Sequence, residues 1–90
     1  MTRETTVSLS PDEVMDLATS FFTGLESGYS GTLIERGEGF ARFQTFRGNL
    51  ALTAWREDGR TRVRCSTRRY HPSIGKFLLK VENTPSPQTA

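Results

Sequence analysis

The dipeptide Asp58-Gly59 most constrains what this chain can fold into, because it predicts a hairpin turn between two runs of alternating residues. A type I′ turn requires positive φ at both central positions, and Asp-Gly is among the sequences that meet this requirement best. Residues 50–56 before the turn and 60–69 after it are therefore expected to pair as antiparallel strands.

Two further glycine-bearing breaks extend this pattern toward the N-terminus. They lie at residues 37–39 and at Gly48-Asn49. Gly48-Asn49 suits a type II′ turn, whose first central position favours glycine. Since consecutive hairpins produce a meander, we expect one antiparallel meander of four strands, over residues 29–36, 40–47, 50–56 and 60–69.

The two turns fix a register and divide the strands into two faces. The turn at 58–59 places Trp55 opposite Arg62, and the turn at 48–49 places Arg42 opposite Trp55. The face expected to join the core carries Ala41, Phe43, Thr45, Leu50, Leu52, Ala54, Val63, Cys65 and Thr67. The opposite face carries Phe40, Arg42, Gln44, Phe46, Ala51, Thr53, Trp55, Arg62, Arg64, Ser66 and Arg68.

A helix is predicted before the meander. Ser10 can serve as N-cap, Pro11 as the first helical residue and Glu13 as the partner in a capping box. Gly24 or Gly28 can end this helix in the left-handed conformation. Apolar residues recur after the cap at the spacing of one helix face, namely Val14, Leu17, Ala18, Phe21, Phe22 and Leu25, with Met15 flanking them.

Two shorter elements complete the expected fold. Residues 5–9 alternate Val7 and Leu9 with polar residues and can add a fifth, N-terminal strand. Residues 73–82 predict a short C-terminal helix, with Ser73 as N-cap; a strand over 77–81 is the alternative. The sequence therefore predicts a single α+β domain over residues 1–83, in which both helices cover one face of a single antiparallel sheet. The polar tail 84–90 is expected to be disordered.

Charge is distributed unevenly along the chain. Residues 1–35 carry one base, Arg3, against six acids, whereas residues 36–80 carry eleven bases against three acids. One interpretation is that the acidic and basic parts attract each other and that the charges are otherwise solvated surface.

The face opposite the core is the candidate binding surface. Aromatic and arginine residues are enriched among the residues that dominate binding energy at protein interfaces. The candidate partner-binding residues are Phe40, Arg42, Phe46, Trp55, Arg62, Arg64 and Arg68. Two alternatives stay open: the arginines only keep a one-sided sheet soluble, or a bulge near Phe43 moves the aromatic side chains into the core.

The residues that catalysis would need are few. His71 is the only histidine and precedes a proline, so we interpret it as a linker residue. Cys65 is the only cysteine and is expected to be buried. Glu35 with Glu38, and Glu57 with Asp58, are interpreted as solvated loop charges. We therefore expect a protein that is not an enzyme and has no metal or other cofactor.

Binding remains as the expected function. We expect an accessory or adaptor subunit that docks onto a larger protein assembly, including the cytoplasmic side of a membrane complex, where an anionic membrane surface can be a peripheral contact. One alternative is a single-stranded nucleic-acid-binding domain, in which aromatic side chains stack on bases. A second alternative is a small ligand carrier, since the order strand, helix, meander and helix loosely resembles helix-grip carriers, although it is much shorter.

The cytoplasm is the expected compartment. The N-terminal residues lack the apolar centre of a signal peptide, and apolar runs are too short to span a membrane. A single cysteine agrees with a reducing compartment.

Overall fold

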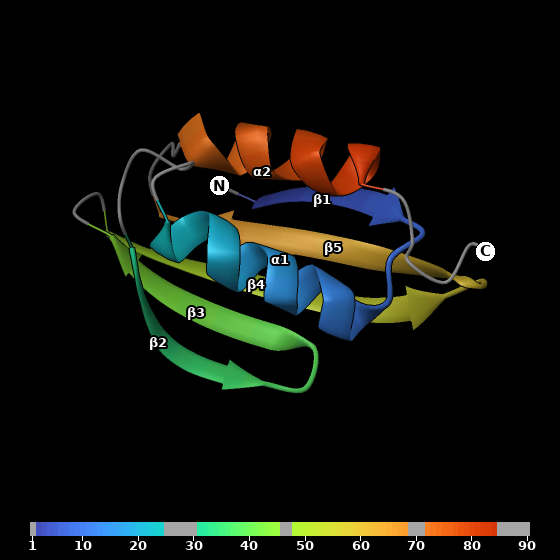
Figure 1. Cartoon of the computed structure of the whole chain (residues 1–90), viewed down its shortest axis with the longest axis horizontal. Coiled ribbons are helices and arrows are strands. Elements are labelled where there is room, and N and C mark those ends of the chain that lie inside the picture. The colour runs from blue at the N-terminus through green and yellow to red at the C-terminus, as the bar shows by residue number, and fades with distance from the viewer. Residues whose placement is uncertain (1, 25–30, 46–47, 69–71, 85–90) are drawn as a thin grey trace.

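A computed structural model describes residues 2–24, 31–45, 48–68 and 72–84 and has the α+β architecture that the sequence predicts (Figure 1). Its five strands form one antiparallel sheet in the order β1-β5-β4-β3-β2. The elements in chain order are β1 (Thr2–Val7), α1 (Pro11–Thr23), β2 (Thr32–Gly37), β3 (Phe40–Thr45), β4 (Gly48–Glu57), β5 (Arg60–Thr67) and α2 (Pro72–Asn83).

The hairpin that joins β4 to β5 is the one predicted from Asp58-Gly59. The φ angles of Asp58 and Gly59 are 53° and 77°, as a type I′ turn requires. Trp55 pairs with Arg62, as predicted. The register of this hairpin was therefore readable from the turn residues alone.

The predicted turn at Gly48-Asn49 is wrong. Thr45, the last residue of β3, pairs with Gly48, so both Gly48 and Asn49 already belong to β4. Arg42 consequently pairs with Ala51 and not with Trp55. The pairing is displaced by four residues, an even number, and side chains alternate with a period of two, so the division into two faces is unchanged.

The alternative of a bulge near Phe43 is not found on β3, and the irregularity lies on the neighbouring strand β2. The register shifts between Leu33 and Glu35 on β2, opposite Phe43 and Arg42. Leu33 packs against the core while Glu35 is exposed, and Phe43 is fully buried. The bulge therefore leaves Phe43 in the core and turns Glu35 outward beside Arg42.

Helix α1 begins with the predicted capping box. The Ser10 hydroxyl accepts a hydrogen bond from the Glu13 amide (3.2 Å), and the Glu13 carboxylate accepts one from the Ser10 amide (2.8 Å). The helix ends at Thr23, and Gly24 is extended (φ −98°, ψ −174°), so it does not form the left-handed cap considered for it. The other candidate for that cap, Gly28, lies outside the described residues. Met15 is fully buried, so it belongs to the apolar face.

The predicted C-terminal helix is confirmed as α2, and residues 77–81 do not form the alternative strand. Its last turn is capped by Thr84, which donates hydrogen bonds from its hydroxyl to the Lys80 carbonyl (2.6 Å) and from its amide to the Val81 carbonyl (3.3 Å). The rest of the predicted disordered tail lies outside the described residues.

Both helices pack on the same face of the sheet, α1 over β2, β3 and β4, and α2 over β1 (Figure 1). The ring of Phe22 lies between sheet and helix, with its centroid 5.3 Å from that of Phe43 and 5.0 Å from that of Phe77. Leu50, Leu52, Val63 and Cys65 are buried beneath the helices, as the face division predicts. In the described part of the chain, no helix is long and apolar enough to span a membrane.

Candidate functional site

None of the described helices covers the second face of the sheet, which we call the open face. Arg42, Arg64 and Arg68 are exposed there, whereas Trp55 and Arg62 are half-buried. Phe40 is half-buried on the same face. The seventh candidate residue, Phe46, lies outside the described residues.

Cross-strand pairing arranges the open face in rows. One row runs from Trp55 through Arg62 to Thr6. A second runs across four strands through Phe40, Thr53, Arg64 and Glu4, and a third runs through Glu35, Arg42, Ala51, Ser66 and Thr2. Neighbours within a row are about 5 Å apart, so their side chains are in direct contact range.

Trp55 is contacted by Arg64, which was not one of the two arginines, Arg42 and Arg62, predicted to flank it. The guanidinium carbon of Arg64 lies 5.4 Å from the centroid of the indole, within the range of a cation–π contact. Arg42 was predicted to flank Trp55, but the shifted β3–β4 register places it opposite Ala51 instead.

Glu4 connects two arginines of the open face. Its carboxylate accepts a hydrogen bond from Nε of Arg64 (2.9 Å) and a second from Nη2 of Arg62. Both hydrogen bonds lower the pKa of Glu4 below its ordinary value of 4.5, and the one from Arg62 has the larger effect. Arg62 also donates to the Thr6 hydroxyl (3.3 Å), and its Nε lies 3.6 Å from the Glu57 carboxylate.

Sequence reasoning missed these carboxylates. Glu35 and Glu57 were interpreted as solvated loop charges, yet both lie in strands, and Glu35 is 3.5 Å from Arg42. Glu4 was not singled out because the N-terminal strand was expected to begin at Thr5. Alternation from Val7, which points inward, would have placed Glu4 on the open face.

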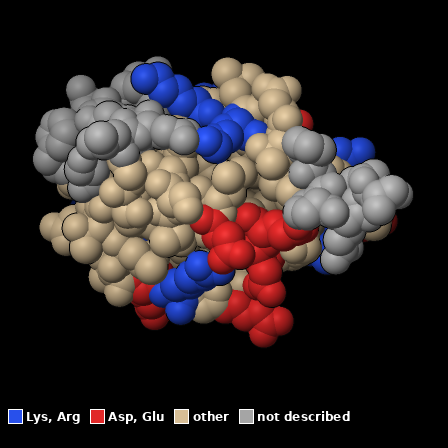
Figure 2. Space-filling model, viewed as in Figure 1, with Lys and Arg blue, Asp and Glu red and all other residues tan. Residues whose placement is uncertain are grey.

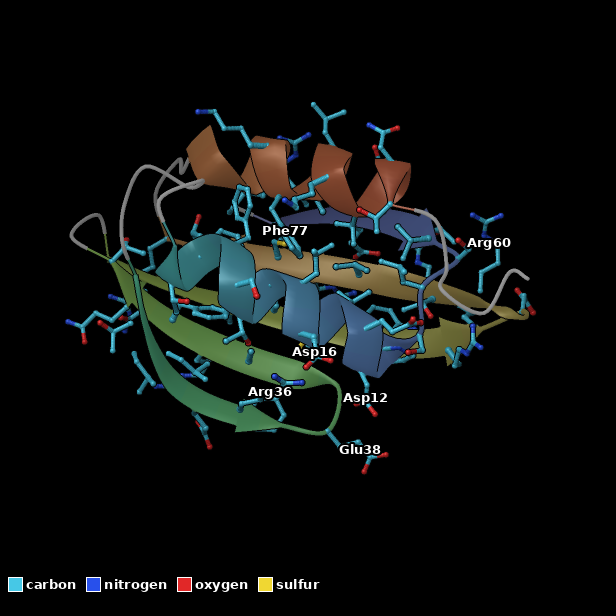
Figure 3. The ribbon with its side chains drawn as sticks, viewed as in Figure 1. Asp12, Asp16, Arg36, Glu38, Arg60 and Phe77 are labelled. Carbon is cyan, nitrogen blue, oxygen red and sulfur yellow. The ribbon has the colours of Figure 1, made fainter. Side chains whose placement is uncertain are left out.

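The ion pairs support the interpretation that the acidic and basic parts of the chain attract each other. Glu4 and Glu35 belong to the acidic part, and each pairs with arginines of the basic part. On the helix-bearing side, Asp16 of α1 pairs with Arg36 of β2 at 2.6 Å (Figure 3). The charges on the two parts are thus partly neutralised within the fold.

The helix-bearing side carries an acidic cluster. Figure 2 shows acidic side chains gathered on this side, and Figure 3 locates Asp12, Asp16 and Glu38 there, near the start of α1 and the connection from β2 to β3. The arginine-rich open face and this acidic cluster therefore lie on opposite sides of the sheet.

Phe40 has a structural role on the open face. It pairs with Gly37 across the β2–β3 hairpin, and a Cβ placed on Gly37 would lie only 2.2 Å from Cε1 of the Phe40 ring. The ring therefore packs directly over the glycine backbone, a known means of stabilising glycine in a sheet. This contact explains why Phe40 is half-buried on an uncovered face.

Depressions lined by described residues mark both ends of the open face. The larger, of about 580 Å³, is lined by Glu4, Thr6, Trp55, Glu57, Asp58, Arg60, Arg62 and Arg64. The smaller, of about 290 Å³, is lined by Arg42, Asn49, Leu50, Ala51, Ser66, Thr67 and Arg68. The first surrounds an aromatic ring with charges of both signs, whereas the charged residues that line the second are both arginines.

Groups suited to catalysis are scarce in the described part of the chain. Within it, no cluster of three or more His, Cys, Asp or Glu residues could hold a metal ion. Cys65 is buried as predicted, and its burial raises the pKa of the thiol to about 12, so the nucleophilic thiolate is suppressed at neutral pH. His71 lies outside the described residues.

Comparison with known proteins gives no assignment: no family model, no curated protein and no solved structure matches this chain.

Proposed function

We propose that this domain is a non-enzymatic interaction module, an accessory or adaptor subunit that docks onto a larger protein assembly through the open face. The main support is the composition of that face, where a half-buried Trp55 stands beside arginines that are already balanced by carboxylates. Tryptophan and arginine are the residue types most enriched at the centres of protein interfaces.

The carboxylates favour a protein partner over single-stranded nucleic acid. Trp55 would be the base-stacking ring, yet the depression around it is also lined by Glu4, Glu57 and Asp58. A polyanion that approaches this ring would meet those negative charges as well as the arginines. Nucleic-acid binding relies on cations that are free to neutralise phosphates, and Arg62 and Arg64 are already hydrogen-bonded to Glu4.

The packing of the interior gives no support to the ligand-carrier alternative. A helix-grip carrier holds its ligand between helix and sheet, and here Phe22, Phe43 and Phe77 fill that space. All three side chains are fully buried.

A cytoplasmic location, including the cytoplasmic side of a membrane complex, belongs to the same proposal. Its support is the single cysteine, Cys65, which is a free and buried thiol.

Affinity purification of the tagged chain from its native source tests the docking function. Trp55→Ala combined with Arg64→Ala should abolish recovery of the partner. The matched control combines Lys76→Ala with Leu79→Ala on the outer side of α2, where Leu79 is 60% exposed. Both variants should keep the wild-type circular dichroism spectrum.

Retention of the partner by the Trp55/Arg64 variant would overturn the use of the open face. Tight binding of mixed-sequence oligonucleotides at low salt, with a steep loss as salt rises, would favour the nucleic-acid function instead.

A further inference from the structure

The two ends of the open face differ in how their arginines are compensated. Arg62 and Arg64 share the Glu4 carboxylate, and Arg62 has Glu57 in addition. At the other end, Arg68 has no carboxylate partner among the described residues. Arg42 has only the solvent-exposed Glu35, at 3.5 Å. Arg60, at the Trp55 end, also has no carboxylate partner among the described residues, but the depression that it lines contains Glu4, Glu57 and Asp58 as well. The charged residues that line the depression at the other end are both arginines, Arg42 and Arg68.

Strand register brings Arg42 and Arg68 to the same depression. Arg42 pairs with Ala51, and Ala51 pairs with Ser66, so Arg42 and Ser66 lie two strands apart, about 10 Å between Cα atoms. Arg68 follows Ser66 by two residues, directly after the end of β5, and lines the same depression as Arg42. The floor between the two arginines consists of the short side chains of Ala51 and Ser66.

The size and chemistry of this depression suit one acidic side chain. Its volume, about 290 Å³, is at the lower limit of pockets that bind small organic molecules, which begin at about 300 Å³. Guanidinium groups bind carboxylates through paired, charge-assisted hydrogen bonds. The contacts that Arg62 and Arg64 make with Glu4 show the same chemistry within this fold.

We propose that Arg42 and Arg68 bind a carboxylate side chain from an acidic segment of the partner protein, seated over Ala51 and Ser66. This inference rests on the proposed docking function and deepens it, since it assigns separate tasks to the two ends of the open face. The Trp55 end, where carboxylates lie among the arginines, packs against uncharged groups of the partner. The Arg42 end provides charge recognition.

A capped hexaglutamate peptide is a suitable probe. It is titrated at low ionic strength into the full chain labelled with ¹⁵N, and the amide signals of Ala51 and Ser66 are followed by NMR. Arg42→Gln combined with Arg68→Gln should weaken binding about tenfold, since charged hydrogen bonds are lost. Arg56→Gln combined with Arg60→Gln removes the same charge at the β4–β5 hairpin and should change binding by less than about twofold.

Three outcomes would overturn the carboxylate site. Equal weakening in both double variants would mean general attraction to a basic protein. Signal changes centred on Trp55 would place the acidic segment at the Trp55 end of the open face and not between Arg42 and Arg68. Stronger binding of an oligothymidine, with the same dependence on Arg42 and Arg68, would identify phosphate as the preferred anion.

Partner recovery separates failure of this site from failure of the docking function. The Arg42/Arg68 variant is compared with the Trp55/Arg64 variant in the same purification. Both should lose the partner. Loss by the Trp55/Arg64 variant alone would leave docking intact and reject the carboxylate site, whereas retention by both would reject docking through the open face.

Discussion

Glu4 on β1 accepts a 2.9 Å hydrogen bond from Nε of Arg64 on β5, so an ion pair reinforces the contact between the N-terminal strand and the last strand of the meander. Arg62 donates to the same carboxylate. These ion pairs hold the acidic beginning of the chain against β5, its most arginine-rich strand. They also lower the net charge of the open face.

Glu4→Gln should reduce the dependence of stability on acidic pH. The pKa of Glu4 is lowered in the folded state, so its contribution is present above the ordinary value of 4.5 and is lost as the pH falls through the lower folded value. Urea unfolding of wild type and variant between about pH 2 and pH 7 measures this. The two stabilities should converge at the acidic end, and a constant difference at every pH would contradict the assignment.

Phe40 and Gly37 should show a large coupling in a double-mutant cycle. Phe40→Ala uncovers the Gly37 backbone and should cost about 1 kcal/mol. Gly37→Ala places a Cβ where the Phe40 ring lies, 2.2 Å from Cε1, so it should also destabilise the protein. In the Phe40→Ala background, the added methyl should be neutral or stabilising. Additive effects in urea unfolding would show that the ring does not depend on this glycine.

Alternation of side chains carried most of the information available from the sequence. Leu52, Val63 and Cys65 are buried and Arg64 is exposed, as predicted, although one of the two turns was misplaced. The division survived because the β3–β4 pairing is displaced by an even number of residues. At Asp58-Gly59 the turn residues were sufficient to predict the hairpin and its register, because both residues have the positive φ that a type I′ turn requires.

Contacts between distant strands could not be predicted in the same way. Gly48 has a φ of 111° and suited a turn position, but it begins β4 and lets Leu50 pair with Phe43 in the core. The partner of β1 depends on tertiary pairing, so the link from Glu4 to Arg64 had no local signal. Because the turn was placed at Gly48-Asn49, Arg42 was predicted to pair with Trp55, whereas it pairs with Ala51.

Gly39 and Gly59 form a matched pair for testing backbone strain. Their φ angles are nearly equal, 76° and 77°. A Cβ on Gly39 would lie 2.8 Å from the Ala54 carbonyl oxygen, whereas one on Gly59 would meet no atom of the described residues within 4 Å. Gly59→Ala should cost about 1 kcal/mol, from φ alone. Gly39→Ala should cost about 1–3 kcal/mol more, from the added clash. Equal losses in thermal unfolding would contradict the close approach of Ala54.

Cys65 should react with thiol reagents only when the protein opens. Burial raises the pKa of its thiol to about 12, so both access and thiolate formation are suppressed in the folded state. The rate of labelling by an aromatic disulfide at pH 8 should rise with urea in parallel with the unfolded fraction. Rapid labelling without urea would mean that β5 opens locally.

Thr61 is predicted to be a site where a single substitution stabilises the protein. It is fully buried, and its hydroxyl has no hydrogen-bond partner among the described residues. An unsatisfied buried hydroxyl costs about 1–3 kcal/mol, and Thr61→Val keeps the shape of the side chain while removing that group. The midpoint of thermal unfolding should rise by about 4–8 °C, the shift that about 1 kcal/mol produces in a domain of this size.

Thr61→Ala provides the control for this prediction. It removes the hydroxyl together with the methyl group and leaves a cavity between β1 and β4, where Thr61 pairs with Val7 and Arg56. Its midpoint should therefore fall below that of Thr61→Val, because the cavity offsets the gain. A fall in the midpoint for Thr61→Val would show that the hydroxyl is satisfied in solution, with a buried water as the partner to seek.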